Sequence, residues 1–257
     1  MERAGGPPAA DLPRRSPGGQ PGARAADQGD HHGPGGGAVN GNRVRLVSLD
    51  VGYTLGAPTG TTITQRLAAL SPLPQEQAKR LVQQHLHHVP PEDTAAIRTL
   101  CQALEVDPAA FPYEHRPEPF TLWPGARDAV ARIARRVPVV TLSNVTYWDE
   151  HDCDLAALLA PHLAGHYPSW RLGFAKPDPQ AVLTVAALHG VPASEVLHVG
   201  DNFACDVQGA LAAGAQALWI TSATPGPETR RLLAAHPGRV RAVPDLDTAV
   251  THIEQAI

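Results

Sequence analysis

The sequence predicts an α/β protein built on a doubly wound parallel sheet, and two observations support this prediction. Strand-like and helix-like segments alternate along the second half of the chain, which is typical of a parallel sheet covered by helices. Two apolar, β-branched runs, at 45–50 and 196–201, each end on an acidic residue. Such runs are typical of strands buried on both faces. We therefore expect both acids at the carboxyl edge of the sheet, where open α/β sheets place their ligand sites.

The bulk properties predict a cytoplasmic protein. At 257 residues, 43% of them apolar, the chain suits one medium domain with an insertion or a small cap. A net charge of −4 gives no case for binding nucleic acid or an anionic membrane surface. The three cysteines are widely spaced without a CxxC pair, which argues against a disulfide framework and fits a reducing compartment. The sequence contains neither an apolar stretch of membrane-spanning length nor the apolar core of a signal peptide.

The first 42 residues are predicted to form a disordered tail, because their Gly- and Pro-rich composition buries too little apolar surface to offset chain entropy. The pair His31-His32 in this tail is interpreted as incidental rather than as a metal site. The ordered chain begins with a strand at 43–50, and apolar residues then recur at helical spacing from about 64 to 106. Prolines divide this stretch into three short helices, and a proline-bearing connection follows at 108–124.

The segment between the first two strands is too long for a simple crossover, so we expect a small helical cap there. The predicted boundaries are 1–42 for the tail, 43–60 and 121–257 for the α/β core, and 61–120 for the cap. The elements predicted after the cap are a helix from Gly125 to Arg136, a strand at 137–142, a helix at 149–160, a weak strand near 166–172, a helix at 178–189, a strand at 196–200, a helix at 204–213, a strand at 216–221, a helix at 227–235, a strand at 239–243 and a helix at 245–256.

Asp50 ends the first predicted strand and opens a loop that contains Gly52 and Thr54. A carboxylate in this position can act as a nucleophile toward phosphorus or carbon. Gly52 leaves the backbone free to approach a ligand, and the Thr54 hydroxyl can hold the loop or orient the carboxylate. The alternative is that Asp50 only caps a turn.

Two further segments carry groups suited to an anion. Ser143 ends the second predicted strand and is followed by Asn144 and a helical segment, which is an arrangement suited to phosphate oxygens, although Ser-Asn is also common turn chemistry. Lys176 lies just before a proline-initiated helix. Its ammonium group can neutralise a bound anion, although most lysines are simply solvated.

Asp201 and Asp206 supply a second acidic group after the strand at 196–200. If the strands of Asp50 and Asp201 are neighbours, the converging negative charge requires a cation or a shared proton. Oxygen donors on a strand-end loop fit Mg²⁺, which takes few carboxylates and keeps several waters. The alternative for Asp206 is that it caps the following helix.

In this order, the four segments resemble the motifs of the haloacid dehalogenase-like hydrolase superfamily. The matching residues of the four motifs are Asp50-Val51-Gly52-Tyr53-Thr54-Leu55, Ser143-Asn144, Lys176-Pro177, and Gly200-Asp201 with Asp206. The stretch from Gly209-Ala210 to Ala213-Gly214 also resembles the helix that follows the fourth motif. The resemblance covers about residues 43–225. It implies a Rossmann-like core whose first strand lies between the second and the fourth, with a helical cap between the first two motifs.

The resemblance also implies a magnesium-dependent hydrolase that acts on a small phosphate ester. Asp50 would attack the phosphorus and form an aspartyl-phosphate. Mg²⁺ would be held by Asp50, the Gly52 carbonyl and Asp201, with Asp206 in the same shell or just outside it. Ser143 and Lys176 would hold the phosphoryl oxygens, since phosphoryl transfer depends on positioning and charge neutralisation. The residues expected to contact the substrate are Thr54, Ser143, Asn144 and Lys176.

Gly52 departs from the pattern of the superfamily's phosphatases, which carry a second Asp there as general acid and base. Such assistance is typically worth about 10²–10⁴-fold in rate, so we expect a slower phosphatase. Two alternatives stay open: an enzyme of this fold that acts on a carbon–halogen or C–P bond, and a binding or regulatory protein with little turnover. The dehalogenase branch uses an arginine near the cap, for which Arg66 is the nearest candidate, and no magnesium. The acids at Asp201 and Asp206 favour the metal-using branch.

The cap carries no motif that identifies the substrate, and the sequence leaves the oligomeric state open. Three histidines, His85, His87 and His88, lie on a predicted cap helix. We interpret them as a solvated cluster rather than as a metal site.

Overall fold

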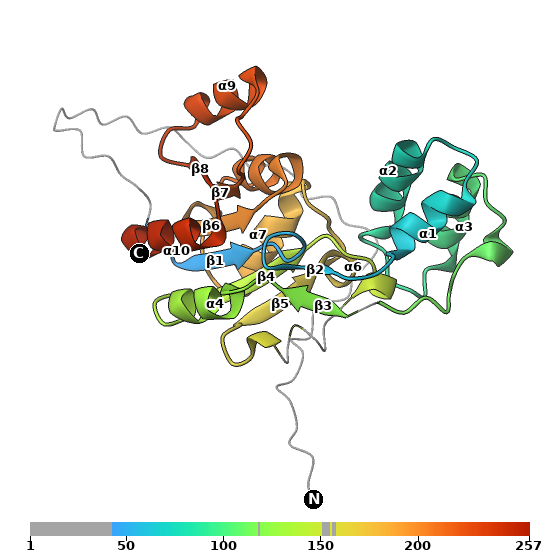
Figure 1. Cartoon of the computed structure of the whole chain (residues 1–257), viewed down its shortest axis with the longest axis horizontal. Coiled ribbons are helices and arrows are strands. Elements are labelled where there is room, and N and C mark those ends of the chain that lie inside the picture. Colours follow the sequence, from blue (N-terminus) through green and yellow to red (C-terminus); the bar gives the residue numbers. More distant parts are fainter. Residues whose placement is uncertain (1–42, 118, 151–154, 156–157) are drawn as a thin grey trace, which may run out of the picture. The chain divides into compact units, whose positions relative to one another are not determined.

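The structure, a computed structural model, describes residues 43–117, 119–150, 155 and 158–257. Its main sheet has six strands in the order β5-β4-β1-β6-β7-β8, and all neighbouring pairs are parallel (Figure 1). The predicted α/β class is confirmed, and β1 lies between β4 and β6 as expected. The strands of this sheet are β1 (Leu46–Leu49), β4 (Val139–Ser143), β5 (Gly165–Pro168), β6 (Val196–Gly200), β7 (Gln216–Ile220) and β8 (Val240–Val243).

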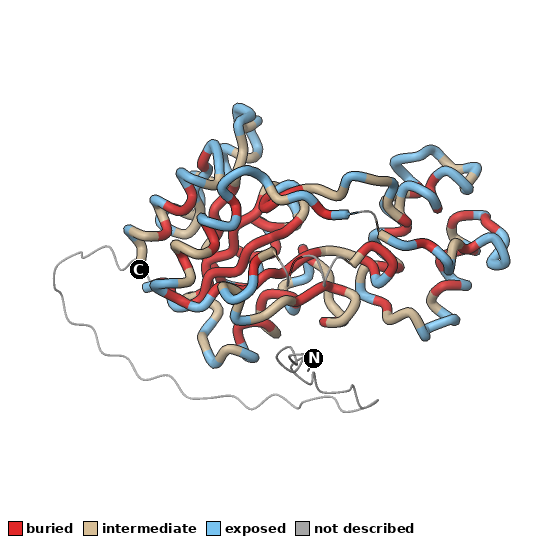
Figure 2. Tube along the Cα trace, turned by 60° about the horizontal axis from the view of Figure 1, so that its bottom comes forward, coloured by how far each residue is buried: buried red, intermediate tan, exposed pale blue. Residues whose placement is uncertain are grey.

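Helices cover both faces of the sheet, because successive strand residues point to opposite sides. On one face, Val47 of β1 belongs to a buried cluster with Val130 of α4 and Val250 of α10. On the other face, Leu46 of β1 belongs to a cluster with Val185 of α7. Figure 2 shows the sheet strands as largely buried. The helices and turns of the core are α4 (Ala126–Ala134), η2 (Tyr147–Asp149), α6 (Ser169–Leu172), α7 (Pro179–Leu188), η3 (Ala193–Glu195), η4 (Phe203–Gln208), α8 (Gly209–Ala212), α9 (Pro227–Ala235) and α10 (Leu246–Ala256).

The insert between β1 and β4 contains three short helices with an apolar cluster of their own. Leu67, Val82 and Leu100, one from each helix, are fully buried in this cluster. The side chains and backbone amides of Thr62 and Gln65 form a capping box that starts the first helix. An antiparallel pair of short strands joins the chain segments on either side of the insert. The elements are β2 (Gly56–Pro58), α1 (Ile63–Leu70), α2 (Gln75–Leu86), α3 (Thr94–Ala103), η1 (Pro108–Ala110) and β3 (Phe120–Leu122).

Several elements differ from their predicted form. The weak strand near 166–172 is a strand only to Pro168 and then turns into α6. The helix predicted at 204–213 is a π-helical turn, η4, followed by α8. The pairing of β2 with β3 was not predicted, because each strand has only three residues and no clear alternation. The helix predicted at 149–160 lies partly outside the described residues, as does the whole predicted tail with His31-His32.

No helix in the described part of the chain is both long enough and apolar enough to cross a membrane.

The carboxylate of Asp149 connects both ends of the insert to the turn after β4. Its Oδ1 accepts from Ile63 N at 2.8 Å, at the start of α1, and lies 3.0 Å from Nε2 of the buried His115. Its Oδ2 accepts from the Thr146 hydroxyl at 3.1 Å. The neighbouring Trp148 is buried in the apolar cluster of the insert. One buried carboxylate therefore satisfies donors from three separate segments.

We predict that Asp149→Ala destabilises the protein by about 3 kcal/mol, because it leaves buried donors without an acceptor. Asp107→Ala is the matched control, since Asp107 is exposed and caps only the short turn η1 through Ala109 N. That change should cost about 1 kcal/mol. Urea denaturation of both variants measures the difference, and equal costs would contradict the connecting role of Asp149.

Candidate active site

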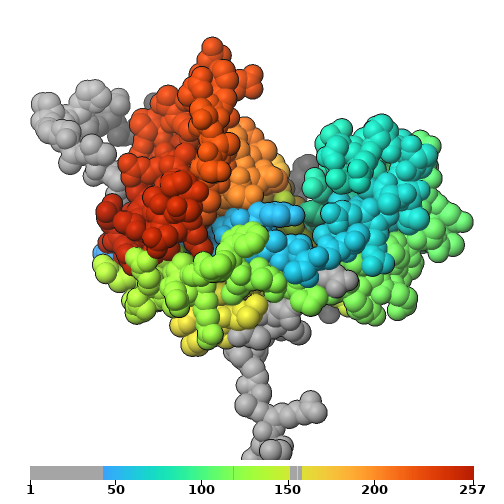
Figure 3. Space-filling view, in the orientation of Figure 1, coloured from blue at the N-terminus to red at the C-terminus, as the bar shows by residue number. Residues whose placement is uncertain are grey.

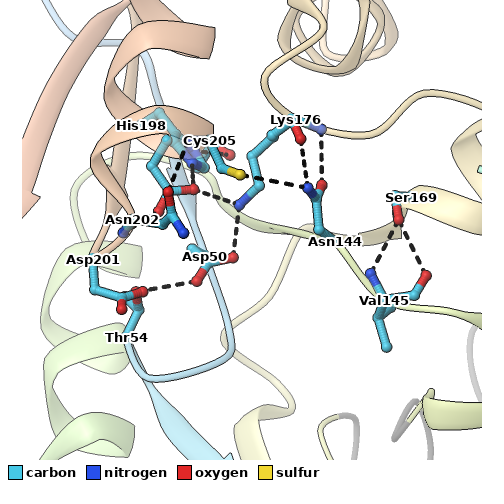
Figure 4. A network of polar contacts seen from close by, with 12 residues as sticks. Asp50, Thr54, Asn144, Val145, Ser169, Lys176, His198, Asp201, Asn202 and Cys205 are labelled. Atoms are coloured by element: carbon cyan, nitrogen blue, oxygen red, sulfur yellow. Dashed lines mark hydrogen bonds and ion pairs between the residues drawn. The ribbon is translucent and has the colours of Figure 1, made fainter. Parts of the chain in front are cut away.

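The ammonium group of Lys176 lies between two buried carboxylates (Figure 4). Lys176 Nζ donates to Asp50 Oδ1 at 2.6 Å and to Asp206 Oδ1 at 2.7 Å. The three side chains come from the end of β1, the loop before α7 and the turn η4. Three residues that the sequence singled out separately are thus in direct contact.

Asp50 is fixed at the end of β1, in the middle of the sheet. Its backbone N donates to Val199 O of β6 at 2.8 Å. The Thr54 hydroxyl lies 3.2 Å from Asp50 Oδ2 and 3.3 Å from Asp201 Oδ1, so its single hydrogen can bond either carboxylate. Thr54 therefore links the loop after β1 to the loop after β6.

Asn144 holds the main chain of Lys176. Its Nδ2 donates to Lys176 O at 2.6 Å, and its Oδ1 accepts from Lys176 N at 2.8 Å. This pair of bonds fixes the point from which the lysine side chain extends. Ser143 is buried at the last position of β4, but no hydrogen bond joins its side chain to Asp50 or Lys176 within the described residues. The predicted substrate contacts of Ser143 and Asn144 stay predictions.

Both oxygens of Asp206 accept hydrogen bonds from within the protein. Oδ1 faces Lys176 Nζ and, at 3.1 Å, His198 Nε2, while Oδ2 accepts from Asn202 N at 2.8 Å. Gly200 makes room for this carboxylate, since a Cβ there would lie 2.2 Å from Asp206 Oδ2. Burial opposes ionisation of Asp206, but Lys176 and His198 outweigh it and hold its pKa well below the usual range. Asp206 therefore stays ionised and pairs with the Lys176 ammonium group.

His198 is a residue of this network that the sequence prediction missed. It is fully buried within β6, and its Nδ1 lies 3.0 Å from Ser48 Oγ, on the facing position of β1. The signal was present in the sequence, because a histidine inside an otherwise apolar strand must find polar partners when it is buried.

The site holds three carboxylates and one ammonium group, so it has an excess of negative charge. The pKa values of Asp50, Asp201 and Lys176 are all raised. Burial, together with the charges of Asp50 and Asp206, raises the pKa of the half-buried Asp201 to about 6. Burial also raises the pKa of Asp50, against the opposing charge of Lys176. Burial works against the ammonium form of Lys176, but Asp50 and Asp206 hold its pKa above the usual range. A cation bound beside Asp50 and Asp201 would relieve this excess of negative charge.

The residues present fit a divalent cation. Asp50, Asp201 and Asp206 each offer an oxygen, and these atoms all lie within 4.8 Å of one another. In the described part of the chain, no other group of three or more His, Cys, Asp or Glu residues meets this condition. Carboxylate oxygens are ligands that Mg²⁺ prefers.

Comparison with known proteins finds relatives in one family. A family model described as haloacid dehalogenase-like hydrolase matches residues 59–214. The chain is 32% identical over 143 residues to a phosphoglycolate phosphatase of Pseudomonas savastanoi pv. phaseolicola, covering 53% of this chain and 48% of the relative. It is 34% identical over 112 residues to a phosphoserine phosphatase of Thermus thermophilus, covering 43% of this chain and 44% of the relative. The match thus spans about half the length of these curated relatives.

Solved structures share the fold. A 2-haloacid dehalogenase from Pseudomonas syringae pv. tomato has a TM-score of 0.51 at 20% identity, covering 82% of this chain and 98% of that one. A phosphatase from Thermococcus onnurineus has a TM-score of 0.51 at 15% identity, covering 82% and 98%. Since the family model spans more than half of the sequence, the chain belongs to the haloacid dehalogenase-like hydrolase family.

We predict that Asp201→Asn stabilises the metal-free protein at pH 8. The folded-state pKa of Asp201 is raised to about 6, whereas its pKa in the unfolded state is about 3.9. Between these pH values the folded state binds a proton that the unfolded state has already released. The stability that comes from this proton is present below about pH 4 and is lost as the pH rises through about 6. The increase in the free energy of unfolding that Asp201→Asn gives over the parent should therefore shrink as the pH is lowered from 8 to 4.5.

Urea denaturation in EDTA measures this gain. Asp93→Asn is the control, since Asp93 is an exposed N-cap residue of α3 and Asn caps a helix equally well. A gain for Asp201→Asn that is the same at both pH values would contradict the charge argument.

Proposed function

We propose that this chain is a magnesium-dependent phosphate-ester hydrolase that works through an aspartyl-phosphate on Asp50. One observation carries the proposal: Lys176 and Thr54 hold the Asp50 carboxylate at the carboxyl edge of the sheet, beside the second carboxylate of Asp201. Two relatives that are named as phosphatases support the choice of phosphorus as the target. The same relatives favour a small phosphorylated substrate. The net charge of −4 gives no case for nucleic acid or an anionic membrane surface as partner, and the scattered cysteines favour a cytoplasmic location.

In the proposed reaction, an oxygen of Asp50 attacks the substrate phosphorus. A new O–P bond forms as the ester P–O bond breaks, and the leaving oxygen takes the electron pair and then a proton from water. Water next cleaves the acyl phosphate, which releases inorganic phosphate and restores the carboxylate. Lys176 and Ser143 would hold the phosphoryl oxygens, and Asn144 would act by fixing the Lys176 backbone.

The proposed Mg²⁺ ligands are Asp50, Asp201 and the Gly52 carbonyl. Asp206 would remain outside this set, because both of its oxygens already accept internal hydrogen bonds. Bound Mg²⁺ would neutralise charge on the phosphoryl group. The raised pKa values of Asp50 and Asp201 support this assignment, since a cation favours the ionised form of both groups.

Carbon–halogen hydrolysis is the second candidate, because a dehalogenase shares the fold and Gly52 cannot act as an acid. The excess of negative charge in the site argues against it, since a haloacid carboxylate would be repelled unless a cation were bound. Arg66 is exposed on α1 and has no contact with the Asp50 network among the described residues. The hypothesis of a binding protein without turnover explains less of the site than an enzyme does, because binding alone does not require the carboxylate of Asp50.

We predict that Asp50→Asn abolishes phosphate release and leaves the thermal midpoint nearly unchanged. Lys176 keeps Asp206 as its ionic partner in this variant, so no charge becomes unpaired. The assay is release of phosphate from p-nitrophenyl phosphate with Mg²⁺ and with EDTA, and Asp93→Asn is the control. Comparable rates for variant and parent would remove Asp50 from the mechanism. Halide release from a haloacid in EDTA, without phosphatase activity, would favour the dehalogenase alternative.

We predict that the parent cleaves aryl phosphates far better than alkyl phosphates, because Gly52 gives no proton to a basic leaving group. Gly52→Asp should narrow this gap by about tenfold or more. The loop can accept the side chain, since Gly52 is not among the residues with positive φ and a Cβ there would meet no atom within 4 Å. The measurement is kcat/KM for phenyl and ethyl phosphate in both proteins. Equal rates for the two esters in the parent would show that another group supplies the proton.

A further inference from the structure

Tyr53 has a backbone conformation that tyrosine rarely adopts. Its φ is 59°, in the left-handed region that disfavours side chains with a Cβ. Its side chain is also the most exposed large hydrophobic group in the described part of the chain, at 67%. An exposed ring contributes little burial energy to offset backbone strain. Since such strain persists mainly at functional sites, Tyr53 calls for a functional explanation.

The surrounding structure fixes this conformation. Tyr53 N donates to Gly56 O at 2.6 Å, and Trp123 Nε1 donates to Tyr53 O at 3.2 Å. Trp123 N in turn donates to Leu55 O at 2.9 Å. The turn at Tyr53 is therefore held by Gly56 of β2 and by Trp123, which follows β3. Trp123 is itself 42% exposed.

Tyr53 lies within the loop that carries the proposed chemistry. It follows Asp50 by three residues and precedes Thr54, whose hydroxyl is 3.2 Å from the Asp50 carboxylate. Three residues of chain span at most about 11 Å, which is within the combined reach of a tyrosine ring and a bound ester. Figure 3 shows the segment after β1, coloured blue, reaching the surface of the molecule.

Four aromatic residues are among the exposed large hydrophobic residues of the described part of the chain. The chain has four residues each of Phe, Tyr and Trp. Those among the exposed large hydrophobic residues lie in the loop after β1, in the segment that leads from η1 toward β3, just after β3, and in the turn after β4. They are Tyr53, Tyr113, Trp123 and Tyr147. Two of these four, Tyr53 and Trp123, are directly hydrogen bonded to each other.

We propose that Tyr53, supported by Trp123, determines substrate specificity by contacting a planar unsaturated ring in the alcohol part of the substrate. This inference rests on the proposed function and names its substrate class: phosphate monoesters that carry an aromatic ring close to the phosphate. Aromatic rings bind one another through offset or edge-to-face contacts, and a rigid tyrosine on a fixed backbone loses little conformational freedom when it makes them. The substrate ring then covers the surface that is exposed in the free protein.

The first test separates ring recognition from leaving-group basicity. Benzyl phosphate and cyclohexylmethyl phosphate are both alkyl esters of similar size, but only the first carries a planar ring. The parent should prefer benzyl phosphate in kcat/KM by about five- to tenfold. Tyr53→Leu should bring this ratio close to one, while inhibition by inorganic phosphate stays unchanged. Leu188→Ala, at the exposed end of α7, is the control and should keep the parent ratio.

The second test asks whether Tyr53 serves the fold. Tyr53→Gly should raise the thermal midpoint, because glycine adopts a positive φ without strain, and it should abolish the benzyl preference. A lower midpoint for Tyr53→Gly, or a ratio in Tyr53→Leu that equals the parent ratio, would overturn the inference.

Calorimetric binding of benzylphosphonate and cyclohexylmethylphosphonate makes the same comparison without turnover. A binding preference that depends on Tyr53, without hydrolysis of either ester, would uphold the ring site and contradict the proposed function. Hydrolysis of both esters without any preference would contradict the ring site alone.

Discussion

The ammonium group of Lys176, shared between Asp50 and Asp206, is the interaction on which the rest of the site depends. Buried carboxylates are unstable as ions unless a positive group or several donors compensate them. Asp206 has such compensation from Lys176, His198 and Asn202. Among the described residues, the Asp50 carboxylate has hydrogen bonds only from the Lys176 ammonium group and the Thr54 hydroxyl. The site thus holds one carboxylate firmly ionised and leaves the other available for chemistry.

The sheet order provides the geometry for this arrangement. Because β1 lies between β4 and β6, the loops after these three strands meet at one edge. The loop after β4 contributes Asn144, which fixes the Lys176 backbone, and β6 contributes His198, which faces Ser48 on β1. Asp206 reaches the same point only because residue 200 is glycine. The contacts of Asn144 with Lys176 and of His198 with Ser48 join segments far apart in the sequence.

Much of this could be predicted from the sequence. Buried strands that end on acids indicate a parallel sheet and its ligand edge, and the family resemblance implied that Asp50 and Asp201 meet there. The direct contacts of Lys176 with Asp50 and Asp206 are seen only in the structure. Other features depend on tertiary contacts that leave little local signal. The two hydrogen bonds between Asn144 and the Lys176 backbone depend on how the loop after β4 and the loop before α7 are placed. The strain at Tyr53 is visible only in its φ angle. The β2–β3 pair is too short for a periodic pattern. The helical end of the segment at 166–172 contacts the turn after β4 through Ser169 and Trp170, and such contacts leave no local signal in the sequence.

The most direct test of this account is a double-mutant cycle between Lys176 and Asp206, measured as free energy of unfolding in EDTA. Lys176→Met should cost about 3–5 kcal/mol, because it leaves buried carboxylates without their cation. Adding Asp206→Asn should recover part of that loss, so that the double variant costs at least about 1 kcal/mol less than the sum of the single changes. Strictly additive costs would show that Lys176 and Asp206 do not stabilise each other, and would contradict the account.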